Sequence, residues 1–325
     1  MVEMESVPTG DAAAMRPYAR LLTGLVLGLL LFVSLVNYFV DPFGMMGRNQ
    51  LGIFLSSERE QRQATANSWP HDAVFLGNSK LSMQNPELLK GFDWYNMSFS
   101  GARIEELVGM MEAYVVDDEL VVLGLDLWMF NENYDLFPKK FKPYGWRTTA
   151  ERYLVSYDAL VASLQTIYYW WNDRTVMSLP GGYTNQELAA ELERADPRRD
   201  FAGIYDYFRN TAAHNFSFSE WRLQLLREAK QKMEERGVEM LVFIHPQNKL
   251  MRDLLATEEF QPHWERFQRE IRTLFPNVVD LSDSEYSEDR DFFLKDPVHY
   301  TPKVSTDFLN EAVIPQSKRY QARQD

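Results

Sequence analysis

The chain has 325 residues, a formal net charge of -13, 45% hydrophobic residues and 25% charged residues. The hydrophobic share is sufficient for a packed core, and the acidic balance without a lysine-rich or arginine-rich tract excludes nucleic acid as a partner. Cysteine is absent, which excludes disulfides, thiolate catalysis and cysteine-ligated metals.

The first predicted element is a transmembrane anchor at residues 21–41. About twenty uncharged residues begin at Leu21, and at about 1.5 Å per residue they span roughly 30 Å, the thickness of a bilayer core. Arg16 and Arg20 precede this run, so the positive-inside rule predicts a cytoplasmic tail at residues 1–20 and a periplasmic or otherwise extracytoplasmic C-terminal part. A cleaved signal peptide is the alternative, but the apolar run is longer than a signal-peptide core and no small-residue cleavage site follows it. We therefore expect a single-pass protein that contacts membrane lipid through this helix.

Residues 42–70 are polar, and we predict a flexible juxtamembrane linker there. Residues 71–325 are predicted to form one domain, interrupted by a helical insertion at about residues 134–218. Within the insertion, apolar residues recur every three or four positions between Leu154 and Trp171, which predicts an amphipathic helix. Its aromatic end is suited to sugar stacking, to core packing or to contact with the membrane surface.

In the rest of the domain, strand and helix patterns alternate. Short apolar runs predict five strands, at residues 73–76, 94–99, 120–125, 238–244 and 277–281. Helical periodicity predicts helices at residues 104–116, 220–236 and 258–274. Strands separated by helices form a parallel sheet, so we predict an α/β fold of the flavodoxin-like, three-layer α/β/α type. Ligands of such folds bind at the carboxyl ends of the strands.

A serine follows the first predicted strand. The sequence Asp72-Ala-Val-Phe-Leu-Gly-Asn-Ser79 places the Ser79 hydroxyl at the carboxyl end of the strand, and we expect Gly77 to permit a tight turn there. The alternative role of Ser79 is to cap the following helix.

An aspartate and a histidine occur together near the C-terminus, in Asp296-Pro-Val-His299-Tyr300. A serine nucleophile needs a neighbouring base, and the base needs a carboxylate that orients it. Asp296 and His299 can supply both from one turn, so we predict a catalytic triad of Ser79, His299 and Asp296. A surface loop with an incidental histidine is the alternative.

The two sequences together resemble the first and last blocks of the SGNH (GDSL-like) hydrolase superfamily, whose nucleophile follows a strand and whose last block is Asp-x-x-His. The resemblance covers roughly residues 72–305 and leaves the helical insertion outside it. The anchor, the Asp-Pro-Phe-Gly sequence after it and the Asp-Pro-x-His-Tyr ending look like membrane-bound bacterial members that take part in alginate O-acetylation.

The resemblance also implies an oxyanion hole. Its donors would be the backbone N–H of Ser79 and that of Gly101, which matches the glycine of the family's second block; a simple strand-to-helix turn is the other reading of Gly101. The family's third block carries an asparagine, whereas this chain has Asp126, whose carboxylate would repel an oxyanion unless it is protonated or turned away. Asn131 is a second candidate for the missing donor.

His245 ends the fourth predicted strand, so it and Asp126 are candidate substrate-binding residues, although a structural histidine is the alternative for His245. The remaining histidines show no metal-ligand spacing, and we predict neither a metal nor another cofactor.

These features predict an extracytoplasmic serine O-acyl esterase or O-acyltransferase that acts on a polysaccharide or another acyl ester of the cell envelope. A multispanning acyltransferase is the partner that the resemblance implies. The alternative is a catalytically silent, SGNH-like glycan-binding or scaffold protein of a membrane acylation complex.

Overall fold

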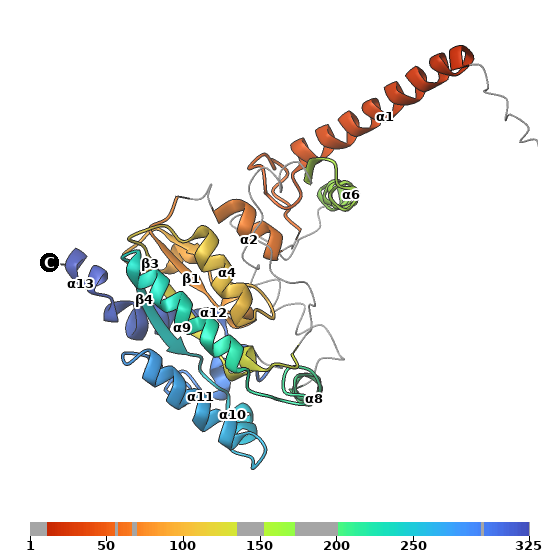
Figure 1. The fold of residues 1–325 in the computed structure, drawn as a ribbon. Helices are drawn as coiled ribbons and strands as arrows, with labels where there is room; N and C mark the ends of the chain where they lie inside the picture. The colour runs from red at the N-terminus through yellow and green to blue at the C-terminus, as the bar shows by residue number, and fades with distance from the viewer. Residues whose placement is uncertain are drawn as a thin grey trace, which may run out of the picture.

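The computed structural model describes residues 12–55, 58–66, 70–134, 153–172, 201–293 and 296–324 (Figure 1). Five strands form one sheet in the order β2-β1-β3-β4-β5, and every neighbouring pair is parallel. The strands are β1 (Ala73–Leu76), β2 (Trp94–Asn96), β3 (Leu120–Leu125), β4 (Glu239–Ile244) and β5 (Val279–Asp280). The prediction of an α/β fold with a parallel sheet of about five strands is therefore confirmed.

The α-helices of the described residues alternate with these strands or lie in the N-terminal region and the insertion. They are α1 (Ala12–Val40), α2 (Glu58–Ala66), α3 (Ser79–Ser82), α4 (Ile104–Tyr114), α6 (Tyr157–Trp171), α8 (Phe201–Asn210), α9 (Glu220–Glu235), α10 (Lys249–Leu255), α11 (Gln261–Leu274), α12 (Pro302–Phe308) and α13 (Lys318–Gln324). The predicted helices correspond to α4, α6, α9 and α11, whereas α10 is too short to have shown a periodic pattern.

Each face of the sheet has its own hydrophobic cluster, because successive strand residues point to opposite faces. Val74 and Val121 lie in the cluster that includes residues of α4, α9 and α11. Phe75 and Val122 lie in the cluster that includes residues of α12. Strands buried on both faces are continuous apolar runs, which is why β1 and β3 match the predicted ranges without any shift.

β2 ends three residues earlier than predicted. The buried amide of Asn96 donates from Nδ2 to the backbone carbonyls of Leu81, Ser82 and Gln84, and its Oδ1 accepts the N–H of Ser98. The side chain thereby binds the loop after β1 to the loop after β2. Both loops lie at the carboxyl edge of the sheet, so Asn96 orders the edge that carries the predicted nucleophile.

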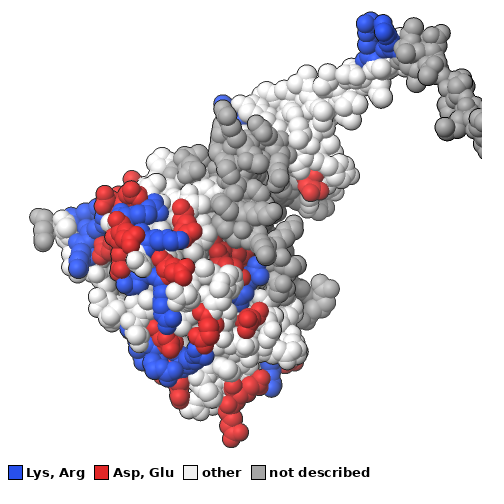
Figure 2. Space-filling model, viewed as in Figure 1, with Lys and Arg blue, Asp and Glu red and all other residues white. Residues whose placement is uncertain are grey.

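Helix α1 extends away from the domain and begins at Ala12, earlier than the predicted anchor (Figure 1). Its segment from Arg16 to Val40 is the one helix among the described residues that is long and apolar enough to cross a membrane. Figure 2 shows basic side chains at the outer end of this helix and no charged side chains along the helix from there to the domain.

Part of the predicted linker is folded, which corrects the prediction that residues 42–70 form a flexible chain. Helix α2 lies within it and packs on the domain: the buried Arg62 guanidinium donates to the carbonyls of Ser98 and Ser82, and Tyr95 donates from its hydroxyl to the Arg62 carbonyl. The polar composition of this segment predicted a linker, but Arg59 and Arg62 make hydrogen bonds to the domain.

Candidate active site

Ser79 is the first residue of α3, directly after β1. Asn78 caps this helix, because its Oδ1 accepts the N–H of Lys80 at 3.0 Å. The alternative in which Ser79 is the cap is therefore wrong, and its hydroxyl is available for another partner. Gly77 does not adopt a left-handed conformation. A Cβ there would lie 2.8 Å from Leu81 Cδ1, so the glycine allows Leu81 to pack closely against the start of the turn.

The structure brings Ser79, His299 and Asp296 into one chain of hydrogen bonds, across 220 residues of sequence. Ser79 Oγ lies 2.8 Å from His299 Nε2, and His299 Nδ1 lies 2.7 Å from Asp296 Oδ2. Both distances are within the range expected of a nucleophile, its base and the carboxylate that orients the base.

A short hairpin presents the histidine and the aspartate. Its two sides are joined by an antiparallel bridge between Phe292 and Tyr300, and the Phe293 N–H donates to the His299 carbonyl at 3.1 Å. At the turn, Asp296 Oδ1 accepts the N–H groups of Val298 and His299. Asp296 and His299, three residues apart, thus lie in one turn. Oδ1 of Asp296 accepts backbone N–H groups of this turn, and Oδ2 faces the imidazole of His299.

The carboxylate of Asp296 remains ionised despite its burial. Burial by itself raises the pKa of Asp296, but the nearby His299 and the two backbone N–H donors outweigh it and hold the pKa below its ordinary value. An ionised Asp296 accepts a proton-bearing Nδ1, which leaves the Nε2 lone pair of His299 directed at Ser79.

A cavity of about 320 Å³ opens beside these residues. Its wall includes residues from the β1, β2 and β3 loops, from the C-terminal hairpin and from the helical insertion. They are Asn78, Ser79, Lys80, Ser100, Gly101, Ala102, Asp126, Trp128, Met129, Tyr134, Ile204, Tyr207, Phe208, Thr211, Ala212, Val298 and His299. The insertion, which lies outside the resemblance, therefore contributes an apolar wall of the site through α8.

Ser79 and Gly101 both border this cavity. Gly101 has a φ of 62°, a conformation that glycine adopts without strain. Among the hydrogen bonds of the described residues, none is donated by the backbone N–H of Ser79 or of Gly101. Both N–H groups thus belong to residues of the cavity wall and have no hydrogen-bond acceptor among the described residues.

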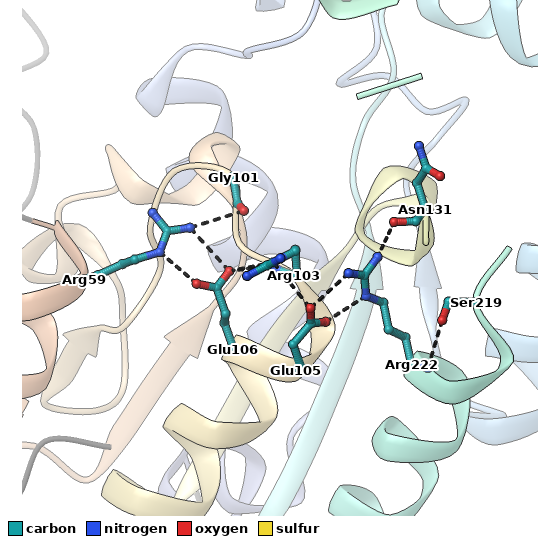
Figure 3. Close-up of polar contacts among 8 residues, drawn as sticks. All are labelled: Arg59, Gly101, Arg103, Glu105, Glu106, Asn131, Ser219 and Arg222. Carbon is teal, nitrogen blue, oxygen red and sulfur yellow. Dashed lines mark hydrogen bonds and ion pairs between the residues drawn. The ribbon is translucent and has the colours of Figure 1, made fainter. Parts of the chain in front are cut away.

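A network of ion pairs supports the loop that contains Gly101 (Figure 3). Arg59 of α2 donates to the Gly101 carbonyl at 3.3 Å and to Glu106 at 2.8 Å. Neighbouring Glu105 accepts two hydrogen bonds from Arg222, at 2.7 and 2.9 Å. The network joins α2, which precedes β1, to the loop that contains Gly101.

Asn131 is not a donor to the site, which corrects one prediction. Its Nδ2 donates to the carbonyls of Ala212 and His214, and its Oδ1 accepts the N–H groups of Asn133 and Ser217. The amide is buried and fully engaged in joining the end of β3 to the end of the insertion.

Asp126 borders the cavity but does not present a free charge to it. Its Oδ2 lies 2.7 Å from the ammonium of Lys80, and both side chains are buried. Burial by itself raises the pKa of Asp126, but the Lys80 charge, the neighbouring His245 and hydrogen bonds from Lys80 and the Trp128 backbone together keep the pKa below its ordinary value. The lowered pKa and the adjacent ammonium favour an ionised, charge-compensated carboxylate over the protonated form considered from the sequence. Nothing in the sequence signalled that Lys80 would be its partner.

His245 lies outside the cavity. It is fully buried, and its Nδ1 lies 2.9 Å from the Tyr300 hydroxyl. Burial, with the adjacent Lys80 charge, lowers the pKa of His245 to about 3. The prediction that it binds substrate is not supported by this position, and the structural alternative is favoured.

No protein-family model matches the chain, and a search of curated proteins finds no match. The geometry of the site therefore carries the functional argument.

Proposed function

We propose that the chain is an extracytoplasmic serine O-acyl esterase or O-acyltransferase of the SGNH type, which acts on a cell-envelope polysaccharide. The observation that carries this proposal is the Ser79–His299–Asp296 chain of hydrogen bonds at the edge of a cavity. A serine with an oriented histidine base and a buried carboxylate is the arrangement used for acyl transfer.

The proposed reaction follows from the contacts. Ser79 Oγ attacks the carbonyl carbon of the ester while His299 Nε2 takes the hydroxyl proton. The C–O bond to the sugar breaks, and His299 returns the proton to the departing sugar oxygen, leaving an acyl-serine. Water or a second sugar hydroxyl then attacks this acyl group, again through His299, and frees Ser79.

The N–H groups of Ser79 and Gly101 are proposed to hold the oxyanion. One such donor contributes about 3–4 kcal/mol to transition-state stabilisation. The ion pair with Lys80 removes the objection that the Asp126 carboxylate would repel the oxyanion, because the positive charge lies 2.7 Å from the negative one.

The fold and the anchor are consistent with this proposal. The strand order and the two hydrophobic clusters support the proposed flavodoxin-like, three-layer arrangement, a type of fold in which ligands bind at the carboxyl edge of the sheet. Basic residues before the apolar part of α1 favour a cytoplasmic N-terminus and a periplasmic domain. A multispanning acyltransferase is the proposed source of acyl groups in the transferase case.

The full-length protein in detergent is expected to hydrolyse an activated acetyl ester and to react with a fluorophosphonate. Ser79→Ala is expected to abolish labelling and to lower kcat by about 10⁵-fold or more. Ser100→Ala is the matched control: Ser100 borders the same cavity, yet no described hydrogen bond joins it to a histidine, so labelling should persist. Equal hydrolysis by wild type and Ser79→Ala would overturn the proposal, and glycan binding without any labelling would favour the silent scaffold.

A further inference from the structure

Helix α6 is exposed on its apolar side and buried on its small-residue side. Its buried residues are Ala159, Ala162, Ser163 and Thr166. Five of its exposed large apolar residues form one stripe at helical spacing: Tyr157, Val161, Leu164, Tyr168 and Trp171. The predicted amphipathic helix is thus confirmed, but its apolar stripe does not enter the core. A water-soluble helix buries such a stripe, so this one points to an apolar surrounding.

The small-residue side of α6 packs against the last turns of α1. Asn37 of α1 is buried there and donates from Nδ2 to the carbonyls of Tyr153, Leu154 and Ser156, while Ser163 donates to its Oδ1. A polar side chain within a membrane-spanning helix is costly unless it is paired, and α6 with its preceding turn supplies the partners. Contact with α1 therefore sets the height of α6 along the anchor.

That height corresponds to the edge of the bilayer. Asn37 lies three residues before the end of α1, which is about 5 Å along a helix. Helices that lie in the membrane interface bury their apolar side by about 5–10 Å. In Figure 1, α6 is seen nearly end-on beside α1, so it crosses the anchor instead of running along it. A helix that crosses a spanning helix lies along the membrane plane.

The remaining sides of α6 fit the same position. Asp158, Gln165 and Asn172 are seven residues apart and share one face, which is exposed. The C-terminal turn carries two tyrosines and two tryptophans, the residue types that gather at membrane–water interfaces. Polar, apolar and aromatic residues are thus distributed as at the boundary between headgroups and acyl chains.

We propose that α6 is an interfacial helix, embedded in the outer leaflet with its apolar stripe against lipid acyl chains. The Asp41 carboxylate at the end of α1 accepts the Tyr153 hydroxyl at 3.0 Å and the N–H groups of Met46 and Arg48, so the anchor, α6 and the start of the linker form one unit. This unit holds the domain close to the membrane surface. The proposal rests on α1 crossing the membrane and is independent of the chemistry at Ser79.

The absence of cysteine allows a direct test on the full chain. Spin labels are placed singly at Leu164→Cys on the stripe, at Gln165→Cys on the polar face and at Leu27→Cys in the middle of α1. The protein is reconstituted in phosphatidylcholine–phosphatidylglycerol vesicles, and collision rates with oxygen and with a water-soluble nickel chelate are measured. The label at Leu164 is expected to collide more with oxygen than with nickel, as at Leu27, whereas the label at Gln165 should show the reverse.

A nickel-accessible label at Leu164 beside an oxygen-accessible label at Leu27 would overturn the proposal and leave the anchor in place. A nickel-accessible label at Leu27 would instead show that α1 is not in the membrane, and the proposal would fall with it. Shielding of Leu164 from both reagents that weakens as protein is diluted in lipid would also overturn it, because the stripe would then be covered by a second copy of the chain.

Discussion

Two groups of acidic and basic side chains lie close together at the carboxyl edge of the sheet, and they differ mainly in burial. In one, Asp296 orients His299, whose side chain is 24% exposed and reaches Ser79 at the cavity. In the other, Asp126 is paired with Lys80 next to His245, and all three side chains are buried. The same residue types thus occur in an open group at the cavity, Ser79, His299 and Asp296, and in a closed group, Lys80, Asp126 and His245.

The comparison shows how the surroundings of a histidine set its chemistry. Burial lowers the pKa of His245 to about 3, so its imidazole is neutral at neutral pH and too weakly basic to cycle protons. His299 has one nitrogen on a carboxylate and the other on a hydroxyl at the cavity edge. Burial thus gives His245 a structural role. His299 is partly exposed at the cavity, where the proposed reaction needs an imidazole for proton transfer.

The largest expected difference between the two groups is in activity. His299→Ala removes the base and is expected to lower kcat for ester hydrolysis by about 10⁵-fold or more. His245→Gln lies outside the cavity and is expected to keep kcat within about tenfold of wild type. Steady-state kinetics on an activated acetyl ester measures both. A similar loss in the two variants would show that the second group belongs to the catalytic machinery.

The carboxylate of the open group has the next largest effect. Asp296→Asn is expected to lower kcat by about 10³–10⁴-fold, because an amide no longer stabilises the imidazolium or fixes the tautomer of His299. The unfolding midpoint in urea is the control and should change little relative to this loss. An unchanged kcat would mean that the Asp296–His299 contact has no role in the reaction.

The closed group is expected to act on stability. Lys80→Met leaves the Asp126 carboxylate buried without its counter-charge, and we expect the free energy of unfolding to fall by about 3–5 kcal/mol. In the double variant Lys80→Met with Asp126→Leu, no buried charge is left unpaired, so most of the loss should be recovered. Urea denaturation of the two variants measures the coupling. Equal losses in both would contradict the ion pair as the origin of the effect.

The smallest effect is a dependence of stability on pH. The pKa of His245 is about 3 in the fold, against about 6.5 in an unfolded chain, so the unfolded state binds one more proton between these values. The contribution of neutral His245 to the free energy of unfolding is therefore fully present above pH 6.5 and is lost as the pH falls toward about 3. Between pH 6.5 and 5.5 wild type should lose about 1 kcal/mol more than His245→Gln in urea denaturation. Parallel losses in the two proteins would count against a neutral buried imidazole.

Local patterns predicted much of the fold and part of the site. Continuous apolar runs predicted the strands, because a strand of a parallel sheet is buried on both faces. The positions of Ser79 after β1 and of Asp296 three residues before His299 follow from short sequence patterns, and the structure brings the three side chains together. His245 directly follows β4 and Asn131 follows the short 3-10 helix after β3, yet Asn131 is engaged with the insertion and His245 is buried. Position at a strand end did not determine where these side chains point.

By itself the sequence determined the long apolar helix, the parallel sheet and the residue types of the open group, since each of these depends on neighbours within a few positions. Tertiary structure alone decided that Lys80 compensates Asp126, that α8 of the insertion walls the cavity, and that α6 packs by its small residues on α1. These outcomes depend on contacts between segments far apart in the chain. Periodicity reveals that a helix has an apolar stripe, but only the packing of the whole molecule shows that the stripe of α6 faces outward.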